Sequence, residues 1–212
     1  MQITIAAATR LELKEAILRQ TSMHPIDVLY TGIGILSSAV SLTQYTLQQK
    51  PGLIIQAGIA GSFDTRYDLG DVVAVKKECL GDTGVQESGE WKDIFDMGFQ
   101  QRNEMPFSNK YLVNEATEKY NVLQLPEVTG VTINEITTDK ARIQMLQTKY
   151  DAQVESMEGA SLHYVCRLLN CPFIQIRAIS NYVGERDKTK WKIKEAIANL
   201  NETVLHILNK ME

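Results

Sequence analysis

The stretch FIQIRAISNYVGERDK, from Phe173 to Lys188, decides the fold class of this chain. Its first part, FIQIRAIS, is mostly apolar on both alternations, which is typical of a strand covered on both faces. Its second part is charged and indicates an exposed loop. Between the two lies Asn181, a polar residue at the carboxyl end of a buried strand, where open α/β sheets bind their ligands. The stretch therefore predicts an α/β protein with a binding site at this end of the sheet.

The same pattern recurs along the chain and extends this prediction to the whole sequence. Further apolar, β-rich runs lie at Ile3–Thr9, Asp27–Gly34, Gly52–Ala60, Asp71–Lys77, Glu127–Asn134 and Ala152–Glu158. Helical periodicity lies between or after them, at Leu11–Thr21, Ile35–Lys50, Thr138–Tyr150, Glu158–Asn170 and Lys188–Lys210. Strands that alternate with helices predict a mainly parallel sheet with helices on both sides. At 212 residues, we expect one α/β domain over residues 1–212.

The composition excludes several classes of protein. Lys and Arg number 22 against 26 Asp and Glu, a formal net charge of -4, so the chain lacks the basic footprint of a nucleic-acid-binding protein. No apolar run approaches the roughly 20 residues of a membrane-spanning helix, and the first residues predict a strand rather than a secretion signal. The three cysteines, Cys79, Cys166 and Cys171, are scattered and favour buried thiols in a reducing compartment. We expect a cytoplasmic protein with no metal site and no nucleic-acid or membrane partner.

One segment, from Gly81 to Asn109, interrupts the alternation of strands and helices. It is long, weakly periodic and carries Trp91, Phe95, Phe99 and Phe107. Long segments with exposed aromatic residues are commonly functional loops or contacts with a partner. We predict one of these two roles for this segment.

Three ionisable residues lie at or near predicted strand ends. Glu12 follows the first strand, and Glu158 stands where a strand becomes a helix. Each is either a helix-start acid that complements the helix dipole or a functional carboxylate; Glu158 could accept hydrogen bonds from the vicinal hydroxyls of a sugar. Arg177 lies inside a buried strand and needs an acid, for which Glu12 and Glu158 are the candidates. Ionisable groups gathered at one rim of the sheet favour a functional site.

Two glycine-rich strand ends lie beside these residues, TGIG at Thr31–Gly34 and QAGIAGSFD at Gln56–Asp64. Glycines there allow a close approach to the backbone and expose its amide donors. Neither stretch matches a P-loop or a dinucleotide-binding fingerprint, so both are weak signals for phosphate.

The motifs ATRLE, TGIG, QAGIAGSFD, LGDVV, ESMEGA and IRAISN follow one another along nearly the whole chain. In this order they resemble the nucleoside phosphorylase and nucleosidase superfamily. Within it they look most like the futalosine hydrolases of the alternative menaquinone pathway, with RAISNYVGERDKTKW as the most telling part. The methylthioadenosine/S-adenosylhomocysteine nucleosidases are the next nearest group.

The resemblance implies a three-layer α/β/α fold with a mixed, partly barrel-like central sheet. It also implies hydrolysis of the N-ribosyl bond of a small-molecule nucleoside without a cofactor. The expected assembly is a homodimer or a higher homo-oligomer, in which a neighbouring subunit helps to cover the 5′ end of the substrate. The region around Phe107 matches that covering element loosely.

The resemblance also assigns roles to single residues. Glu12 occupies the position of the general base for water, and Arg177 that of the arginine that orients this acid and the water. Glu158 matches the carboxylate that binds the ribose hydroxyls, and Met157 the methionine packed on the sugar. The remaining substrate-binding candidates are Gly58 and Ile59 on one strand and Ile136 and Thr137 in the segment Val131–Thr137, which is expected to recognise the base.

Two residues depart from the pattern of the adenine-specific nucleosidases. Ile59 stands where those enzymes have a serine, so that one hydrogen bond to the water or the ribose is missing or moved to Ser62. Asn181 stands where they have an aspartic acid, which can protonate adenine at N7. An amide cannot give up a proton but can donate a hydrogen bond to O6 or N7, so Asn181 indicates a 6-oxopurine such as hypoxanthine. Asn181 is alternatively a turn residue at the end of a strand.

Three alternatives to a futalosine hydrolase stay open at this stage. A phosphorylase of the same fold would need converging arginines, and Arg10 and Arg66 are the nearest candidates. A methylthioadenosine or aminofutalosine nucleosidase differs only in its substrate. A non-catalytic binding module with an α/β fold is the third.

Overall fold

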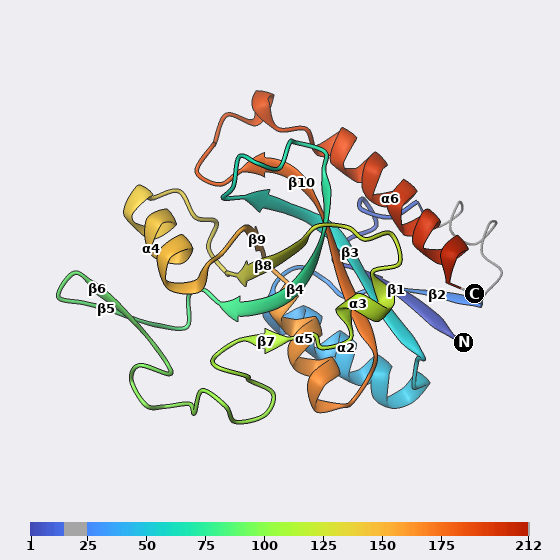
Figure 1. The fold of residues 1–212 in the computed structure, drawn as a ribbon, viewed down its shortest axis with the longest axis horizontal. Coiled ribbons are helices and arrows are strands. Elements are labelled where there is room, and N and C mark those ends of the chain that lie inside the picture. Colours follow the sequence, from blue (N-terminus) through green and yellow to red (C-terminus); the bar gives the residue numbers. More distant parts are fainter. Residues whose placement is uncertain (15–24, 212) are drawn as a thin grey trace.

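The computed structural model of the chain describes residues 1–14 and 25–211. Its strands are β1 (Ile3–Ala7), β2 (Ile26–Tyr30), β3 (Leu53–Ser62), β4 (Val72–Leu80), β5 (Gly84–Glu87), β6 (Glu90–Asp93), β7 (Leu112–Val113), β8 (Glu127–Thr132), β9 (Val154–Ser156) and β10 (Phe173–Tyr182). Its helices are α2 (Ile35–Gln49), α3 (Thr117–Tyr120), α4 (Lys140–Tyr150), α5 (Gly159–Leu168) and α6 (Ile193–Lys210), with a 3-10 turn at Lys188–Lys190 before the last. Figure 1 shows their arrangement.

The central sheet is mixed and closes on itself in part. Strands β2, β1, β3 and β10 run parallel and side by side. From β10 the pairing continues through β4, β8 and β9 and returns to β3, which completes a five-stranded barrel. The β10–β4 and β9–β3 pairs are antiparallel, and so is the pair that β7 makes with β4. The mixed, partly barrel-like sheet expected from the sequence is therefore confirmed.

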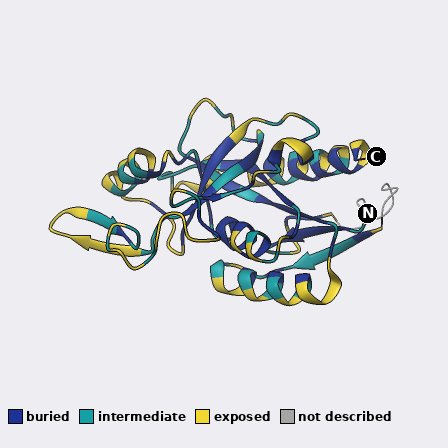
Figure 2. Ribbon diagram, turned by 60° about the horizontal axis from the view of Figure 1, so that its bottom comes forward, coloured by how far each residue is buried: buried dark blue, intermediate teal, exposed yellow. Residues whose placement is uncertain are grey.

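Helices cover the two faces of the sheet, which gives three layers (Figure 1). Ala196, Leu200 and Val204 of α6 pack with side chains of β1, β3 and β10 in one core cluster. Leu42 of α2 and Leu162 of α5 pack on the other face. The central strands β1, β3 and β10 are largely buried, and Figure 2 shows most of the sheet between the helices in dark blue. The three-layer fold is therefore confirmed.

The interior of the barrel has an apolar part and a polar part. Val73, Val75, Val128, Val154 and Ile179 form its apolar cluster, together with Ala60. The polar part consists of buried side chains from four strands: Gln56, Glu78, Thr132, Gln175 and Arg177. Apolar strands normally bury apolar side chains, so this polar group needs a functional or structural reason.

Some boundaries differ from those that the sequence predicts. Residues 15–21 of the helix predicted at Leu11–Thr21 lie outside the described residues, and residues 11–14 form a turn and an extended segment. β10 runs past Ser180 to Tyr182, because it continues to pair with β3. The segment Gly81–Asn109 contains the exposed hairpin β5–β6, which Figures 1 and 2 show beside α4 and extending from the rest of the molecule.

Candidate active site

Glu12 lies in the turn after β1 and points its carboxylate at β3. Its Oε2 accepts a hydrogen bond of 3.0 Å from the backbone N–H of Thr9, and its Oε1 accepts one of 3.3 Å from the N–H of Ile59. The side chain thus links the turn after β1 to β3. Burial raises the pKa of Glu12 above its ordinary value, and the nearby positive charge of Arg177 opposes part of this effect. Such a carboxylate is a stronger base than one in water.

Arg177 meets Glu12 over a glycine of β3. A Cβ atom on Gly58 would collide with the Arg177 guanidinium and lie 3.1 Å from Glu12 Oε1. Because glycine has no side chain, the Arg177 guanidinium and the Glu12 carboxylate both fit above the backbone of Gly58. Arg177 is only 2% exposed, and its Nη2 donates a 2.9 Å hydrogen bond to Gln56 Oε1. Gln56 is thus a partner of Arg177 that the sequence interpretation missed.

Glu158 lies at the junction of β9 and α5 and reaches across to the start of α2. Its Oε1 accepts a 2.9 Å hydrogen bond from the backbone N–H of Gly34, whose φ of 86° favours glycine. The side chain makes no capping bond to its own helix. Its other carboxylate oxygen has room to accept further hydrogen bonds, because a carboxylate has about four acceptor sites. The negative charge of Glu158 lies close enough to Glu12 to contribute to its raised pKa.

A second buried acid, Glu78 of β4, supports this region from inside the barrel. Glu78 accepts hydrogen bonds of 2.9 Å from Thr132 Oγ1 and from Gln175 Nε2. Thr132 Oγ1 in turn accepts a 2.7 Å bond from the N–H of Ala160, in the first turn of α5. Complete burial raises the pKa of Glu78 to about 7. This network holds the start of α5, and with it the backbone next to Glu158.

The sequence signals for these supporting residues are weak. Gln56 and Gln175 are single polar residues inside apolar strands, and Glu78 directly follows two lysines, Lys76 and Lys77. A polar residue at such a position is commonly on an exposed edge, and only the closed barrel places these side chains inside the protein.

Asn181 faces the opposite side of the sheet from Arg177. Gly58 pairs with Arg177, and Gly61 pairs with Asn181, after a register shift in β10 between Ile179 and Asn181. Successive residues of a strand alternate between faces, so positions 58 and 61 of β3 lie on different faces. Arg177 and Asn181 are four residues apart, and in a regular strand this spacing would place both side chains on the same face. The bulge between them turns Asn181 to the other face.

The amide of Asn181 is held by its neighbours but keeps one donor. The Ser180 hydroxyl donates a 2.8 Å hydrogen bond to Oδ1, and Nδ2 donates one of 3.2 Å to the carbonyl of Tyr182. An amide nitrogen carries two N–H groups, so one of them stays available to a ligand.

The segment expected to recognise the base ends beside β9. The backbone N–H of Thr137 donates a 3.3 Å hydrogen bond to Glu155 Oε1, and Thr137 itself is buried. Ile136, in contrast, is 48% exposed.

Ile59 is half-buried on β3. Ser62, the suggested replacement for the missing serine, uses its hydroxyl in a turn with the carbonyl of Asp64 at 2.9 Å.

Met157 and Phe107 differ in exposure. Met157 is half-buried between β9 and Glu158. Phe107 is 6% exposed and packs with Leu112 and Ala160 in a small core cluster of this same chain. Ala160 follows Glu158 by two residues, so Phe107 packs near the sugar-binding candidate.

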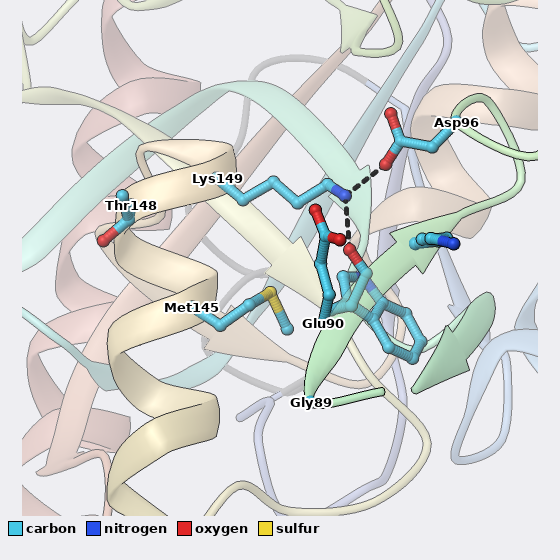
Figure 3. A pocket seen from close by; sticks show the side chains of 8 residues that line it. Gly89, Glu90, Asp96, Met145, Thr148 and Lys149 are labelled. Carbon is cyan, nitrogen blue, oxygen red and sulfur yellow. Dashed lines mark hydrogen bonds and ion pairs between the residues drawn. The ribbon is translucent and has the colours of Figure 1, made fainter. Parts of the chain in front are cut away.

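A separate hollow lies between the β5–β6 hairpin and α4. Figure 3 shows that Met145, Thr148 and Lys149 of the helix line it opposite Glu90 and Asp96. The Lys149 ammonium pairs with Asp96 and donates a 2.9 Å hydrogen bond to the carbonyl of Trp91. The lining of this hollow includes none of the residues predicted to form the active site.

The structure thus brings three predicted residues, Glu12, Arg177 and Glu158, together around β3, whereas Asn181 projects from the other face of the sheet. Within residues 1–14 and 25–211, no cluster of three or more His, Cys, Asp or Glu side chains could hold a metal ion. In the same ranges, no helix is long and apolar enough to cross a membrane.

Known proteins resemble this chain over most of its length. The model of a family described as the phosphorylase superfamily matches residues 15–210. The futalosine hydrolase of Streptomyces coelicolor is 30% identical over 184 residues, which cover 84% of this chain and 76% of that protein. The 5′-methylthioadenosine/S-adenosylhomocysteine nucleosidase of Bacillus velezensis is 26% identical over 195 residues, covering 88% and 81%. The solved futalosine hydrolase of Helicobacter pylori shares the fold with a TM-score of 0.81 at 18% identity, covering 100% of this chain and 98% of that one.

Proposed function

The chain belongs to the phosphorylase superfamily, and on this premise we propose that it hydrolyses the N-ribosyl bond of a 6-oxopurine nucleoside, with futalosine as its substrate. Its relatives are named as hydrolases and nucleosidases, and the chain is an enzyme of this nucleosidase type. The products would be hypoxanthine and the base-free ribosyl compound, as a step of menaquinone biosynthesis.

The observation that carries this proposal is the meeting of Glu12 and Arg177 over Gly58. Cleavage of an N-ribosyl bond passes through a state with positive charge on the sugar and negative charge on the departing base. Glu12 takes a proton from a water molecule as its oxygen attacks C1′ of the ribose. The buried Arg177 places its positive charge near the Glu12 carboxylate and keeps it partly ionised, and the raised pKa of Glu12 makes this carboxylate a better base.

Glu158 binds the ribose in this mechanism. Its Oε1 is fixed by the N–H of Gly34, and its remaining acceptor sites take hydrogen bonds from the 2′ and 3′ hydroxyls. Met157 packs on the sugar ring. The network of Glu78, Thr132 and Ala160 keeps the start of α5, and hence Glu158, in a fixed position.

Asn181 donates its free amide hydrogen to O6 or N7 of the departing base. In adenine only N7 could accept this hydrogen bond, because the amino group at position 6 cannot, and an amide has no proton to transfer to N7 to help the base depart. The methylthioadenosine and aminofutalosine nucleosidases are the main competing assignment, because such relatives match this chain at similar identity. Asn181 favours the 6-oxopurine among these substrates.

A comparison of four nucleosides tests the function. We expect the protein to release base from futalosine without phosphate, and at least about 10-fold more slowly from aminofutalosine and methylthioadenosine, because a mismatched buried hydrogen-bonding group is rejected. Inosine serves as the 6-oxopurine without the 5′ substituent. The free base is followed by chromatography. Equal rates on futalosine and aminofutalosine would contradict the 6-oxopurine assignment, and a strict requirement for phosphate would indicate a phosphorylase.

We also propose that the chain forms a homodimer through α2 and α5. Leu36, Val40 and Leu47 are exposed along one side of α2, and Tyr164 and Leu168 are exposed on α5. An apolar groove lies between these two helices. A second copy with the same apolar surface would cover both, as in a two-fold interface. Because Gly34 precedes α2 and binds Glu158, this interface would adjoin the sugar-binding side of the site.

Light scattering of the purified chain tests the dimer. We expect twice the mass of the 23.8 kDa chain, and the mass of a single chain for Val40→Glu, because a charge buried in an apolar interface is costly. Val85→Glu, at an exposed valine of the β5–β6 hairpin, is the matched control and should stay dimeric. A dimer that survives Val40→Glu would place the interface elsewhere.

We also propose that the enzyme is cytoplasmic. Its cysteines form no disulfide and are all buried: Cys79, Cys166 and Cys171. Free cysteines of this kind are typical of reducing compartments.

A further inference from the structure

Cys166 and Cys171 meet across the end of α5. The helix ends at Leu168, and Asn170 follows it in the left-handed conformation, with a φ of 51°. The backbone N–H of Cys171 then donates a 2.9 Å hydrogen bond to the carbonyl of Cys166. This arrangement is a Schellman motif, in which the side chains of the two residues so joined commonly touch.

The backbone geometry of this motif suits a disulfide. With standard bond lengths, the hydrogen bond between Cys171 and Cys166 places their Cα atoms at most about 6.8 Å apart. Disulfides join Cα atoms that lie about 4.4–6.8 Å apart. Both side chains belong to one core cluster, and the thiol of Cys166 donates a hydrogen bond to the sulfur of Cys171. The two sulfurs are therefore already neighbours in the folded chain.

The two thiols differ in their tendency to ionise. The hydrogen bond from Cys166 lowers the pKa of Cys171, whereas burial raises the pKa of Cys166 well above its ordinary value. The other contacts of the Cys171 sulfur, to the carbonyls of Pro172 and Pro51, are long, at 3.6 and 3.8 Å. Cys171 is therefore the nucleophile of the pair, and Cys166 is the adjacent thiol that can react with an oxidised Cys171.

A hollow at the surface gives a small oxidant access to both sulfurs. Cys166 and Cys171 line it, with Asn114 and Lys119 among the other lining residues. Cys171 is 8% exposed and Cys166 1%. This hollow shares no lining residue with the apolar groove between α2 and α5, so the dimer interface proposed above does not include it.

We propose that Cys166 and Cys171 form a redox modification site, which hydrogen peroxide converts into a disulfide that a thiol reductant opens again. The Cys171 thiolate attacks one oxygen of the peroxide, so that an S–O bond forms and the O–O bond breaks. The departing hydroxide takes up the proton that Cys171 has lost and becomes water, which leaves Cys171 as a sulfenic acid.

The second step forms the disulfide. The Cys166 sulfur attacks the Cys171 sulfur, and the S–O bond breaks as the hydroxyl leaves with the Cys166 proton as a second water. Two thiols are thus oxidised by two electrons in total, and one peroxide is reduced to two molecules of water. Neither residue belongs to the proposed active site, so this inference is independent of the proposed hydrolysis.

Trypsin gives a direct readout, because Arg167 lies between the two cysteines. The folded, reduced chain is treated with hydrogen peroxide, its remaining thiols are blocked with iodoacetamide in urea, and it is digested without a reductant. Mass spectrometry should find peptide 150–167 linked to peptide 168–177, and dithiothreitol should separate them. Cys79, whose pKa burial raises well above its ordinary value, should be recovered as the blocked thiol. The absence of this link, or a link through Cys79 in its place, would overturn the proposal.

Single variants test the separate roles of the two thiols. In Cys166→Ser we expect Cys171 to stop at the sulfenic acid, which dimedone traps. In Cys171→Ser we expect Cys166 to be oxidised at least about 10-fold more slowly than Cys171 is in the other variant, since a buried protonated thiol is a poor nucleophile. Cys79→Ser is the matched control and should form the link at the rate of the unaltered protein. Equal oxidation in the first two variants would overturn the assignment of Cys171 as the nucleophile.

Discussion

Replacing Glu12 with glutamine is expected to lower kcat for futalosine by about 10²- to 10⁴-fold, the contribution typical of a general base. Glutamine keeps the size of the side chain and an acceptor for the N–H of Thr9, but it cannot take a proton from water. KM should change much less than kcat, because the proposal assigns the ribose and the base to other residues. Steady-state kinetics on futalosine give both constants.

The melting temperature of Glu12→Gln shows whether a loss of activity comes from lost chemistry or from a lost fold. Burial raises the folded-state pKa of Glu12 above 4.5, so its neutral form stabilises the fold fully below pH 4.5. That stabilisation is lost as the pH rises through the raised pKa. The ionised acid therefore costs stability at neutral pH, and Glu12→Gln should melt no lower than the unaltered protein.

The same pKa sets a pH profile for the reaction. Because only the ionised Glu12 accepts a proton, kcat should fall as the pH drops through its raised pKa, so the acid limb lies above pH 4.5. Glu87→Gln, at an exposed acid of the β5–β6 hairpin, should have normal kinetics. If Glu12→Gln keeps most of its activity, Glu12 is not the base.

Replacing Asn181 with aspartic acid is expected to shift the substrate preference from the 6-oxopurine toward the 6-aminopurine. An aspartate oxygen would still accept from Ser180, but the other oxygen would face the carbonyl of Tyr182, where the amide now donates at 3.2 Å. That repulsion favours the protonated acid, which can donate to N7 of adenine and promote its departure. We expect the ratio of kcat/KM for futalosine over aminofutalosine to fall by about 10-fold or more.

Competition between the two nucleosides in one reaction measures this ratio directly. Asn170→Asp, an equivalent change at an exposed residue after α5, should leave the ratio unchanged. An unaltered ratio in Asn181→Asp would indicate that Asn181 only ends its strand.

The strand pattern shows how far local sequence predicts this fold. The runs at Gly52–Ala60 and Phe173–Ser180 are apolar on both alternations, and both are central strands that helices cover on each face. Periodicity also predicts α2 and α5 within a few residues. These features depend on contacts between near neighbours along the chain, which a short window of sequence contains.

The candidate site residues were predicted on different grounds. Arg177 in a buried strand demands compensation, and the order of the motifs assigned Glu12 and Glu158 to the same region through a family resemblance. No local pattern indicated that Gln56 would bind Arg177, or that Glu78 would hold the start of α5 through Thr132. Those partners lie more than 50 residues apart in sequence.

The sequence by itself therefore determined the order of strands and helices and the chemical types of the site residues, because these follow from local periodicity and from the cost of burying charge. Only the tertiary structure decided which strands close the barrel and that a bulge turns Asn181 to the opposite face of the sheet from Arg177. The physical reason is that a shift of one residue in strand register moves every following side chain to the other face, and register is set by pairing between distant strands.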